Sequence, residues 1–300
     1  MQLFKNNLSI DFNSFVSKTK IISAILILIS IIVLIVQGLN LTIEFLGGTN
    51  LSVSVPNTSI TNFRDSVEPI FNHDIEIVEL SDNSNFNTFR LRMKFIDNDS
   101  EIINQLKIIY PLLILNSVDS FGPKLGSELQ HNARNAMLLA LLLISIYIAL
   151  RFDRYYALGS VAALAHDIII TLGVLAIFNI EIGITVIAGI LTIIGYSLND
   201  TIVVYDRIRE NILKLYENTR SEIINRSLNE TLNRTVITSM TTLMVVIVLL
   251  IFGGSVLKPF AITLLIGIFI GTYSSIFVAS PVMLYFEEKY PIPEFKDEED

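Results

Sequence analysis

The segment that most strongly indicates the fold is GILTIIGYSLNDTIVVYDRIR, residues 189–209. Up to Val204 it is apolar enough for a membrane-spanning helix, yet it carries Asn199 and Asp200 within the apolar run. A carboxylate in hydrocarbon costs roughly 2.5 to 3.5 kcal/mol on insertion scales, so such a residue usually faces the interior of a helical bundle and marks a functional path. We therefore expect a helical bundle organised around Asp200.

The composition places the chain among polytopic membrane proteins. Of its 300 residues 52% are hydrophobic, and the mean hydropathy is +0.60. Cysteine is absent and the three histidines lie far apart in the sequence, which excludes disulfides and thiol chemistry and argues against a metal site. The net charge of -8, partly due to the acidic residues 294–300, argues against a nucleic-acid partner.

Six charge-poor runs predict six transmembrane helices. A helix rises about 1.5 Å per residue, so about 20 residues cross the roughly 30 Å hydrocarbon core. We expect the first run to remain in the mature protein as a transmembrane helix. It is longer than the roughly 7 to 15 apolar residues of a cleaved signal peptide, and EFLGG lacks a small-residue cleavage site. The runs are residues 21–39, 133–152, 155–178, 182–204, 232–252 and 260–286.

The basic residues of the short loops predict the orientation. Those between spans two and three and between spans four and five carry Arg151, Arg154, Arg207, Arg209, Lys214, Arg220, Arg226 and Arg234, whereas the short loops on the other side carry only Lys258. Cytoplasmic loops are enriched in Lys and Arg. We therefore expect the N-terminal residues 1–20, the loop 205–231 and the acidic tail 287–300 to be cytoplasmic, and residues 40–129 to lie outside.

Residues 40–129 read as a small water-soluble domain. Alternating or short apolar runs predict strands, and two polar stretches with helical signals predict helices, in the order strand, helix, strand, strand, helix, strand. That order is the split pattern of ferredoxin-like α+β domains. The expected elements are residues 49–55, 59–71, 74–80, 88–96, 99–109 and 114–118, followed by a linker at 121–130.

Asp200 and Arg234 are the first candidate functional pair. Arg234 lies near the start of span five, which begins on the side where span four ends, so the two residues are at a comparable depth. We expect them to approach each other. The alternative is that Arg234 extends to the lipid headgroups as one more basic residue at the cytoplasmic surface.

Span three carries His166 and Asp167 near the middle of the bilayer. His166 shares a helical stripe with Gly159 and Gly173, and small residues let helices approach closely, so both polar side chains should face the bundle. They suit either a proton relay or an interhelical hydrogen bond, and the sequence leaves both open. In span six, Gly267 and Gly271 predict helix packing, and Pro281 predicts a bend.

Four sequence blocks resemble the SecF branch of the SecD/SecF family, within the RND transporter superfamily. The resemblance implies a six-helix RND-type half-bundle with one periplasmic ferredoxin-like domain after the first span, located in the bacterial inner membrane. It also implies pairing with SecD, association with the SecYEG channel and with YajC, and unfolded preprotein as the substrate. The blocks are ALRFDRYYALGSVAALAHDIIITLGVLAIF (149–178), TVIAGILTIIGYSLNDTIVVYDRIREN (185–211), LNETLNRTVITSMTTL (228–243) and GTYSSIFVASPV (271–282).

The resemblance also implies residue roles. The family aspartate and arginine matched by Asp200 and Arg234 are implicated in proton conduction, and His166 with Asp167 matches the family's His-Asp pair. With Asn199 these residues form the expected proton relay. The family motif Asp-Phe-x-Gly-Gly-Thr appears here as Glu44, Phe45, Leu46, Gly47, Gly48 and Thr49, in which Glu keeps the charge on a longer arm and the glycines suit a tight turn.

The function expected from these features is proton-driven assistance to protein export, without enzymatic activity or a cofactor. The membrane potential supplies about 2.3 kcal/mol per charge per 100 mV. No GxxxxGK[ST] nucleotide-binding loop occurs in the sequence. Three alternatives remain: an intramembrane aspartyl protease using Asp167 and Asp200, half of an RND exporter of small molecules or lipids, and a passive scaffold.

Overall fold

The computed structural model describes residues 10–71, 75–82, 86–96, 99–215 and 217–290. The chain divides into two compact units, one made of Met1–Asn40 with Ala136–Asp300 and the other of Leu41–Asn135. The first unit is a bundle of long helices, and the second contains a β-sheet.

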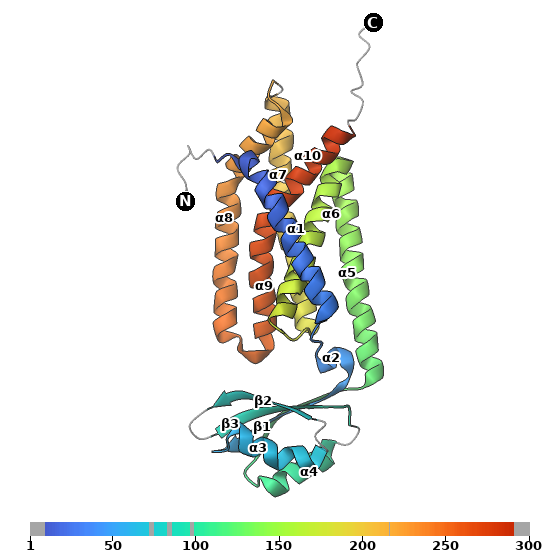
Figure 1. Ribbon diagram of the computed structural model, residues 1–300, viewed down its shortest axis with the longest axis vertical. Helices are drawn as coiled ribbons and strands as arrows, with labels where there is room; N and C mark the ends of the chain where they lie inside the picture. The colour runs from blue at the N-terminus through green and yellow to red at the C-terminus, as the bar shows by residue number, and fades with distance from the viewer. Residues whose placement is uncertain (1–9, 72–74, 83–85, 97–98, 216, 291–300) are drawn as a thin grey trace. The chain divides into compact units, whose positions relative to one another are not determined.

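Six helices in the described part of the chain are long and apolar enough to cross a membrane, as the sequence predicts (Figure 1). The last of them is a composite of two α-helices joined by a π-helical turn. The helices are α1 (Phe12–Val36), α5 (Pro123–Arg151), α6 (Arg154–Ile177), α7 (Ile184–Lys214), α8 (Arg220–Phe252), and α9 (Gly254–Ser274) continued by α10 (Ser280–Lys289).

Two kinds of helix make up the bundle. About half of the apolar window of α6 and of α7 is buried inside the chain, 56% and 50%, whereas the windows of α1, α5 and α8 are mostly exposed, with 17%, 6% and 17% buried. Helices that are apolar all round and exposed in an isolated chain suit contact with lipid or with partner helices. The interior of the bundle is therefore built from α6, α7 and α9, and α1 lies across α6 (Figure 1).

The break in the last span lies where Pro281 predicts a bend. Ser275–Ala279 form a π-helical turn, and Pro281 occupies the first turn of α10. Proline has no N–H to donate to the carbonyl four residues earlier, and its ring crowds that turn. A wider turn before Pro281 accommodates the ring without ending the helix.

Most of the expected loop 205–231 between spans four and five is helical. Helix α7 continues to Lys214 and α8 begins at Arg220. Thr219 and Glu222 form a capping box at the start of α8. Glu230 accepts hydrogen bonds from Arg207 (2.7 Å) and Asn211 (2.7 Å) of α7, so the polar ends of the two helices are tied together.

The residues expected to form a linker, 121–130, are mostly the start of a helix. Strand β4 (Ile114–Phe121) runs to its start, and α5 begins at Pro123. Glycine and proline are common loop residues, but proline is also favoured in the first turn of a helix, where no N–H is required. Gly126 lies inside α5 against Phe45, where an added Cβ would meet the Phe45 carbonyl oxygen at 2.7 Å.

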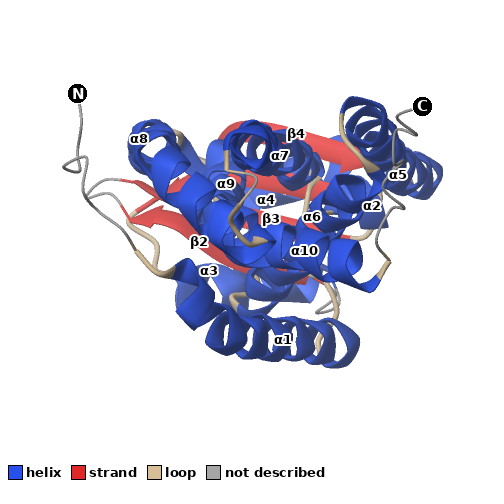
Figure 2. Ribbon diagram, turned by 90° about the horizontal axis from the view of Figure 1, so that it is seen from above, coloured by secondary structure: helices blue, strands red, loops and turns tan. Residues whose placement is uncertain are grey.

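The second unit contains a four-stranded antiparallel sheet, two α-helices that lie between strands in the sequence, and the first turns of α5. Its sheet order is β2-β3-β1-β4, and its elements follow the predicted order along the chain. All strands of the described residues belong to this sheet, and the remaining regular structure is helical (Figure 2). The elements are α2 (Ile43–Leu46), β1 (Gly48–Pro56), α3 (Ile60–Val67), a 3-10 helix (Glu68–Phe71), β2 (Ile75–Asp82), β3 (Phe86–Met93), α4 (Asp99–Ile109) and β4.

Alternation along the strands forms the core of this unit. Leu51, Val53 and Val55 of β1 are buried, as period-two spacing on one face of a strand predicts. Phe63 of α3 stacks on Phe89 of β3 with ring centroids 4.3 Å apart. The helices α3 and α4 therefore cover one face of the sheet (Figure 1).

Candidate functional site

Asp167 lies at the centre of a buried hydrogen-bonded cluster that joins three helices. Its side chain, on α6, is 1% exposed. The Oδ2 atom accepts hydrogen bonds from Ser197 Oγ of α7 at 2.6 Å and from Ser274 Oγ of α9 at 2.8 Å. The Oδ1 atom lies 3.0 Å from Nδ1 of His166. Both carboxyl oxygens of Asp167 therefore have protein partners.

Small residues bring the three helices close enough for these hydrogen bonds. A Cβ added to Gly271 of α9 would lie 3.0 Å from the Cβ of Ser197, and one added to Gly267 would lie 2.1 Å from Ile193 of α7. The packing predicted from the Gly267 and Gly271 spacing is confirmed by these contacts. Close approach of this kind places Ser274, one turn after Gly271, within reach of Asp167.

His166 extends the cluster toward α1. Its ring stacks on Tyr273 of α9, with centroids 6.0 Å apart and an interplanar angle of 22°. The hydroxyl of Tyr273 donates to the carbonyl oxygen of Thr19 at 3.0 Å and lies 2.9 Å from Ser23 Oγ, both on α1. The Nε2 atom of His166 is buried and has no hydrogen-bond partner among the described residues.

Asp200 is buried in a different way. It follows Ser197 by three residues on α7 and is 2% exposed. Its Oδ2 atom has no hydrogen-bond partner within the part of the chain that the structure describes. The same helix therefore carries one residue that completes the Asp167 cluster and one carboxyl group with an unpartnered oxygen.

Arg234 does not form the expected contact pair with Asp200. Its side chain on α8 is exposed, and across residues 10–71, 75–82, 86–96, 99–215 and 217–290 no ion pair joins the two. The predicted contact between Arg234 and Asp200 is therefore absent from the described part of the chain.

Asn199 lies apart from the other candidate relay residues. It is exposed, whereas Asp200, the next residue, is buried. Successive residues of an α-helix are about 100° apart around the axis, so neighbours in sequence face different surroundings. Asn199 shares the exposed face of α7 with Thr192 and Gly195. Within this chain, Asn199 therefore faces away from the buried side chains of Asp167 and Asp200.

The Glu44 motif forms a tight turn at the start of the sheet. Glu44 lies in α2, where its Oε2 accepts a hydrogen bond from Thr42 Oγ1 at 3.3 Å. Gly47 and Gly48 have φ values of 76° and 150°, which side-chain-bearing residues rarely adopt. Thr49 is buried, with its Oγ1 3.0 Å from Ser120 Oγ of β4. The motif thus anchors the first strand to its neighbour.

Sequence reasoning identified the acidic residues but missed the hydroxyls that surround them. Ser197, Tyr273 and Ser274 lie in largely apolar segments and give no signal of their own. Their spacing could have found them, since Ser197 precedes Asp200 by three residues and Ser274 follows Gly271 by three. Within the described residues, no three His, Asp or Glu side chains gather as metal ligands.

Comparison with known families gives a consistent result. The family described as "Protein export membrane protein SecD/SecF, C-terminal" matches residues 102–289. The chain is 41% identical to the protein translocase subunit SecF of Calditerrivibrio nitroreducens, over 93% of this chain and 95% of that protein. It is 40% identical to the protein translocase subunit SecF of Escherichia coli O157:H7, over 88% of this chain and 83% of that protein.

Solved structures of SecDF are similar to this chain throughout its length. The chain matches SecDF from Thermus thermophilus, a translocon-associated membrane protein, with a TM-score of 0.85 and 34% identity, over 95% of this chain and 40% of that chain. It matches a super-membrane-facing form of SecDF with a TM-score of 0.72 and 34% identity, over 96% of this chain and 40% of that chain. The chain thus spans less than half of each SecDF chain but nearly all of its curated relatives. This multi-pass membrane protein belongs to the SecF branch of the SecD/SecF family of protein-export membrane proteins.

Proposed function

We propose that this chain pairs with SecD and uses the proton gradient across the bacterial inner membrane to assist late translocation and release of preproteins through SecYEG. The observation that carries the proposal is Asp200, a buried carboxyl group with an unpartnered oxygen on a membrane-spanning helix. Intramembrane acids are expensive to bury and mark ion or proton paths. No cofactor and no covalent chemistry are required.

Helix α7 links the proposed proton step to the rest of the bundle. Gain or loss of a proton changes the charge of the Asp200 side chain on α7. Ser197, on the same helix, donates a hydrogen bond to Asp167 of α6 at 2.6 Å. The same Asp167 oxygen accepts from Ser274 of α9. A small shift of α7 is therefore passed to two neighbouring helices. The field supplies about 2.3 kcal/mol per charge per 100 mV, which is enough to bias such a shift.

The remaining parts of the proposal follow the charge pattern and the sheet topology. Both termini are cytoplasmic, as the eight basic loop residues favour, and the unit Leu41–Asn135 is a ferredoxin-like periplasmic domain that holds emerging polypeptide. SecD covers the exposed side chains of Asn199 and Arg234, because polar groups in membrane helices usually face a partner or a water-filled cavity. YajC is a further partner of the same complex.

The alternative functions are less well supported. A protease dyad needs two carboxyl groups that share a water or a proton, whereas both oxygens of Asp167 are engaged by Ser and His partners. Half of an RND exporter of small molecules or lipids is the remaining alternative. Proton flux stimulated by such a ligand in reconstituted vesicles would support the exporter.

The proposed function is tested by Asp200→Asn in inverted inner-membrane vesicles. We expect the variant to fold and to purify with SecD, but to lose the proton-dependent phase of preprotein export. Asp206→Asn is the matched control, since it makes the same change on the same helix at a half-exposed residue paired with Arg151 at 3.4 Å. Export by Asp200→Asn at the wild-type rate would contradict the proposal.

A further inference from the structure

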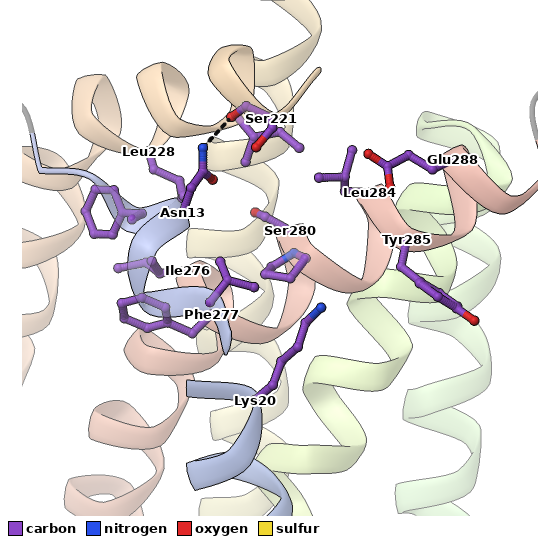
Figure 3. A pocket seen from close by; sticks show the side chains of 14 residues that line it. Asn13, Lys20, Ser221, Leu228, Ile276, Phe277, Ser280, Leu284, Tyr285 and Glu288 are labelled. Atoms are coloured by element: carbon purple, nitrogen blue, oxygen red, sulfur yellow. Dashed lines mark hydrogen bonds between the residues drawn. The ribbon is translucent and has the colours of Figure 1, made fainter. Parts of the chain in front are cut away.

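A pocket lies between the cytoplasmic ends of α1, α8 and α10 (Figure 3), and neither Asp167 nor Asp200 lines it. Its volume is about 210 Å³. Most of the wall is apolar and includes Phe12, Ile224 and Phe277. Two charged side chains reach it from different helices, Lys20 from α1 and Glu288 from α10.

The position of Lys20 places the pocket at the membrane surface. Lys20 is the last charged residue of α1 before the charge-free run 21–39. Lysines at the ends of membrane helices extend their amines toward the headgroup region while their aliphatic stems cover apolar surface. The pocket therefore opens at the depth where a lipid has its phosphate and the start of its acyl chains.

The two charges of the pocket are available to a ligand. Neither Lys20 nor Glu288 has an ion pair or a side-chain hydrogen bond to another described residue. The ammonium group of Lys20 attracts a phosphate, and the carboxylate of Glu288 attracts an ammonium group. The carboxylate would repel a purely anionic headgroup, so the combination favours a headgroup that carries both charges.

We propose that this pocket binds one phospholipid with an ammonium-bearing headgroup, such as phosphatidylethanolamine. The phosphate contacts Lys20, the ammonium group points toward Glu288, and the first methylenes of the acyl chains lie against Phe277. The volume is smaller than the roughly 300 to 1,000 Å³ of drug-sized sites, so the pocket holds the headgroup while the tails stay in the bilayer.

The test measures lipid retained by the full-length chain. The purified protein is equilibrated with dioleoyl phosphatidylethanolamine, phosphatidylglycerol or phosphatidylcholine in mixed micelles, and bound lipid is counted by native mass spectrometry. We expect one phosphatidylethanolamine per chain, retained in preference to phosphatidylglycerol, which has no ammonium group, and to phosphatidylcholine, whose quaternary ammonium has no N–H to donate to Glu288. Lys20→Gln should lower its retention about five-fold, the effect of one basic residue at an anionic headgroup. Glu288→Gln should shift the preference toward phosphatidylglycerol.

Lys18→Gln is the matched control, because Lys18 is exposed on the same helix and does not line the pocket. Thermal unfolding of each variant verifies that it is folded. Unchanged retention in Lys20→Gln, equal retention of the three lipids, or an equal loss in Lys18→Gln would overturn the proposal. Equally tight binding of glycerophosphoethanolamine, which lacks the acyl chains, would show that the pocket takes a soluble ligand instead of a lipid.

Discussion

Asp167 and Asp200 lie on neighbouring helices and are equally buried, but their surroundings differ. The carboxyl group of Asp167 is engaged by His166, Ser197 and Ser274. Within the described residues, Oδ2 of Asp200 has no hydrogen-bond partner. A carboxyl group with three hydrogen-bond partners is suited to fixing helices in place, whereas one with an unpartnered oxygen is suited to exchanging a proton. Burial alone does not distinguish the two acids.

The difference has an energetic consequence. Leaving a buried acceptor without a hydrogen bond costs about 1–3 kcal/mol. The side chain of Asp200 therefore contributes less to the stability of the fold than that of Asp167. The structure therefore predicts large stability losses for changes around Asp167 and small ones for changes at Asp200. Unfolding of the full chain by dodecyl sulfate in mixed micelles places all of the following variants on one scale.

Asp167→Ala should have the largest effect. It removes the common acceptor of Ser197 and Ser274 and the partner of His166, and breaking a buried pair in this way costs about 3–5 kcal/mol. Asp167→Asn, which keeps an acceptor oxygen, should lose less. A loss in Asp167→Ala no greater than about 0.5 kcal/mol, the range of an ordinary surface substitution, would show that the cluster does not hold the helices together.

Gly271→Val should be the next most harmful. A Cβ at this position would lie 3.0 Å from the Cβ of Ser197, so the new side chain pushes α9 away from α7, at an expected cost of about 1–3 kcal/mol in the free energy of unfolding. Gly195→Val is the matched control, because an added Cβ there has no neighbour within 4 Å. Equal losses in the two variants would mean that close packing of α9 on α7 is not the cause.

Ser197→Ala and Ser274→Ala should each have a smaller effect, about 0.6–1.7 kcal/mol, which is the range of interhelical hydrogen bonds in membranes. Both hydroxyls donate to Asp167 Oδ2, so the double variant should depart from the sum of the single losses. Ser145→Ala on α5 is the control, since its hydroxyl bonds only to the carbonyl of Leu141 on the same helix. Strict additivity would argue against a shared cluster.

Asp200→Asn should have the smallest effect on stability. The amide has nearly the same size as the carboxyl group and removes a charge that lacks a contact partner, so we expect a change within about 0.5 kcal/mol. A loss comparable with that of Asp167→Ala would make Asp200 a structural residue like its neighbour. The contrast between the two acids would then disappear.

The sequence predicted the parts of this molecule that depend on local pattern. Charge-poor runs located the six long helices, alternation in 49–55 located the central strand, and the spacing of Gly267 and Gly271 predicted close helix packing, which the contact of α9 with α7 confirms. Each of these depends on neighbours within a few turns of one element. The acidic residues stood out because hydrocarbon rarely surrounds a charge.

The parts that the sequence did not predict depend on contacts between distant elements. No secondary structure was predicted in the polar loop 205–231, where Glu230 and Asn211 join two helical extensions. Arg234 has the right depth for a pair with Asp200, but depth does not determine the direction in which a long side chain points. Ser197 and Ser274 are ordinary in sequence, and only the packing of α6, α7 and α9 gives them a common partner.

The most direct test of the central claim is infrared difference spectroscopy of the lipid-embedded protein as the pH is changed. The protonated-carboxyl band should contain one component that rises and falls with pH in the wild type and in Asp167→Asn and that is missing from the spectrum of Asp200→Asn. This result would assign reversible protonation to Asp200. Persistence of that component in Asp200→Asn, together with its loss in Asp167→Asn, would contradict the account by exchanging the roles of the two acids.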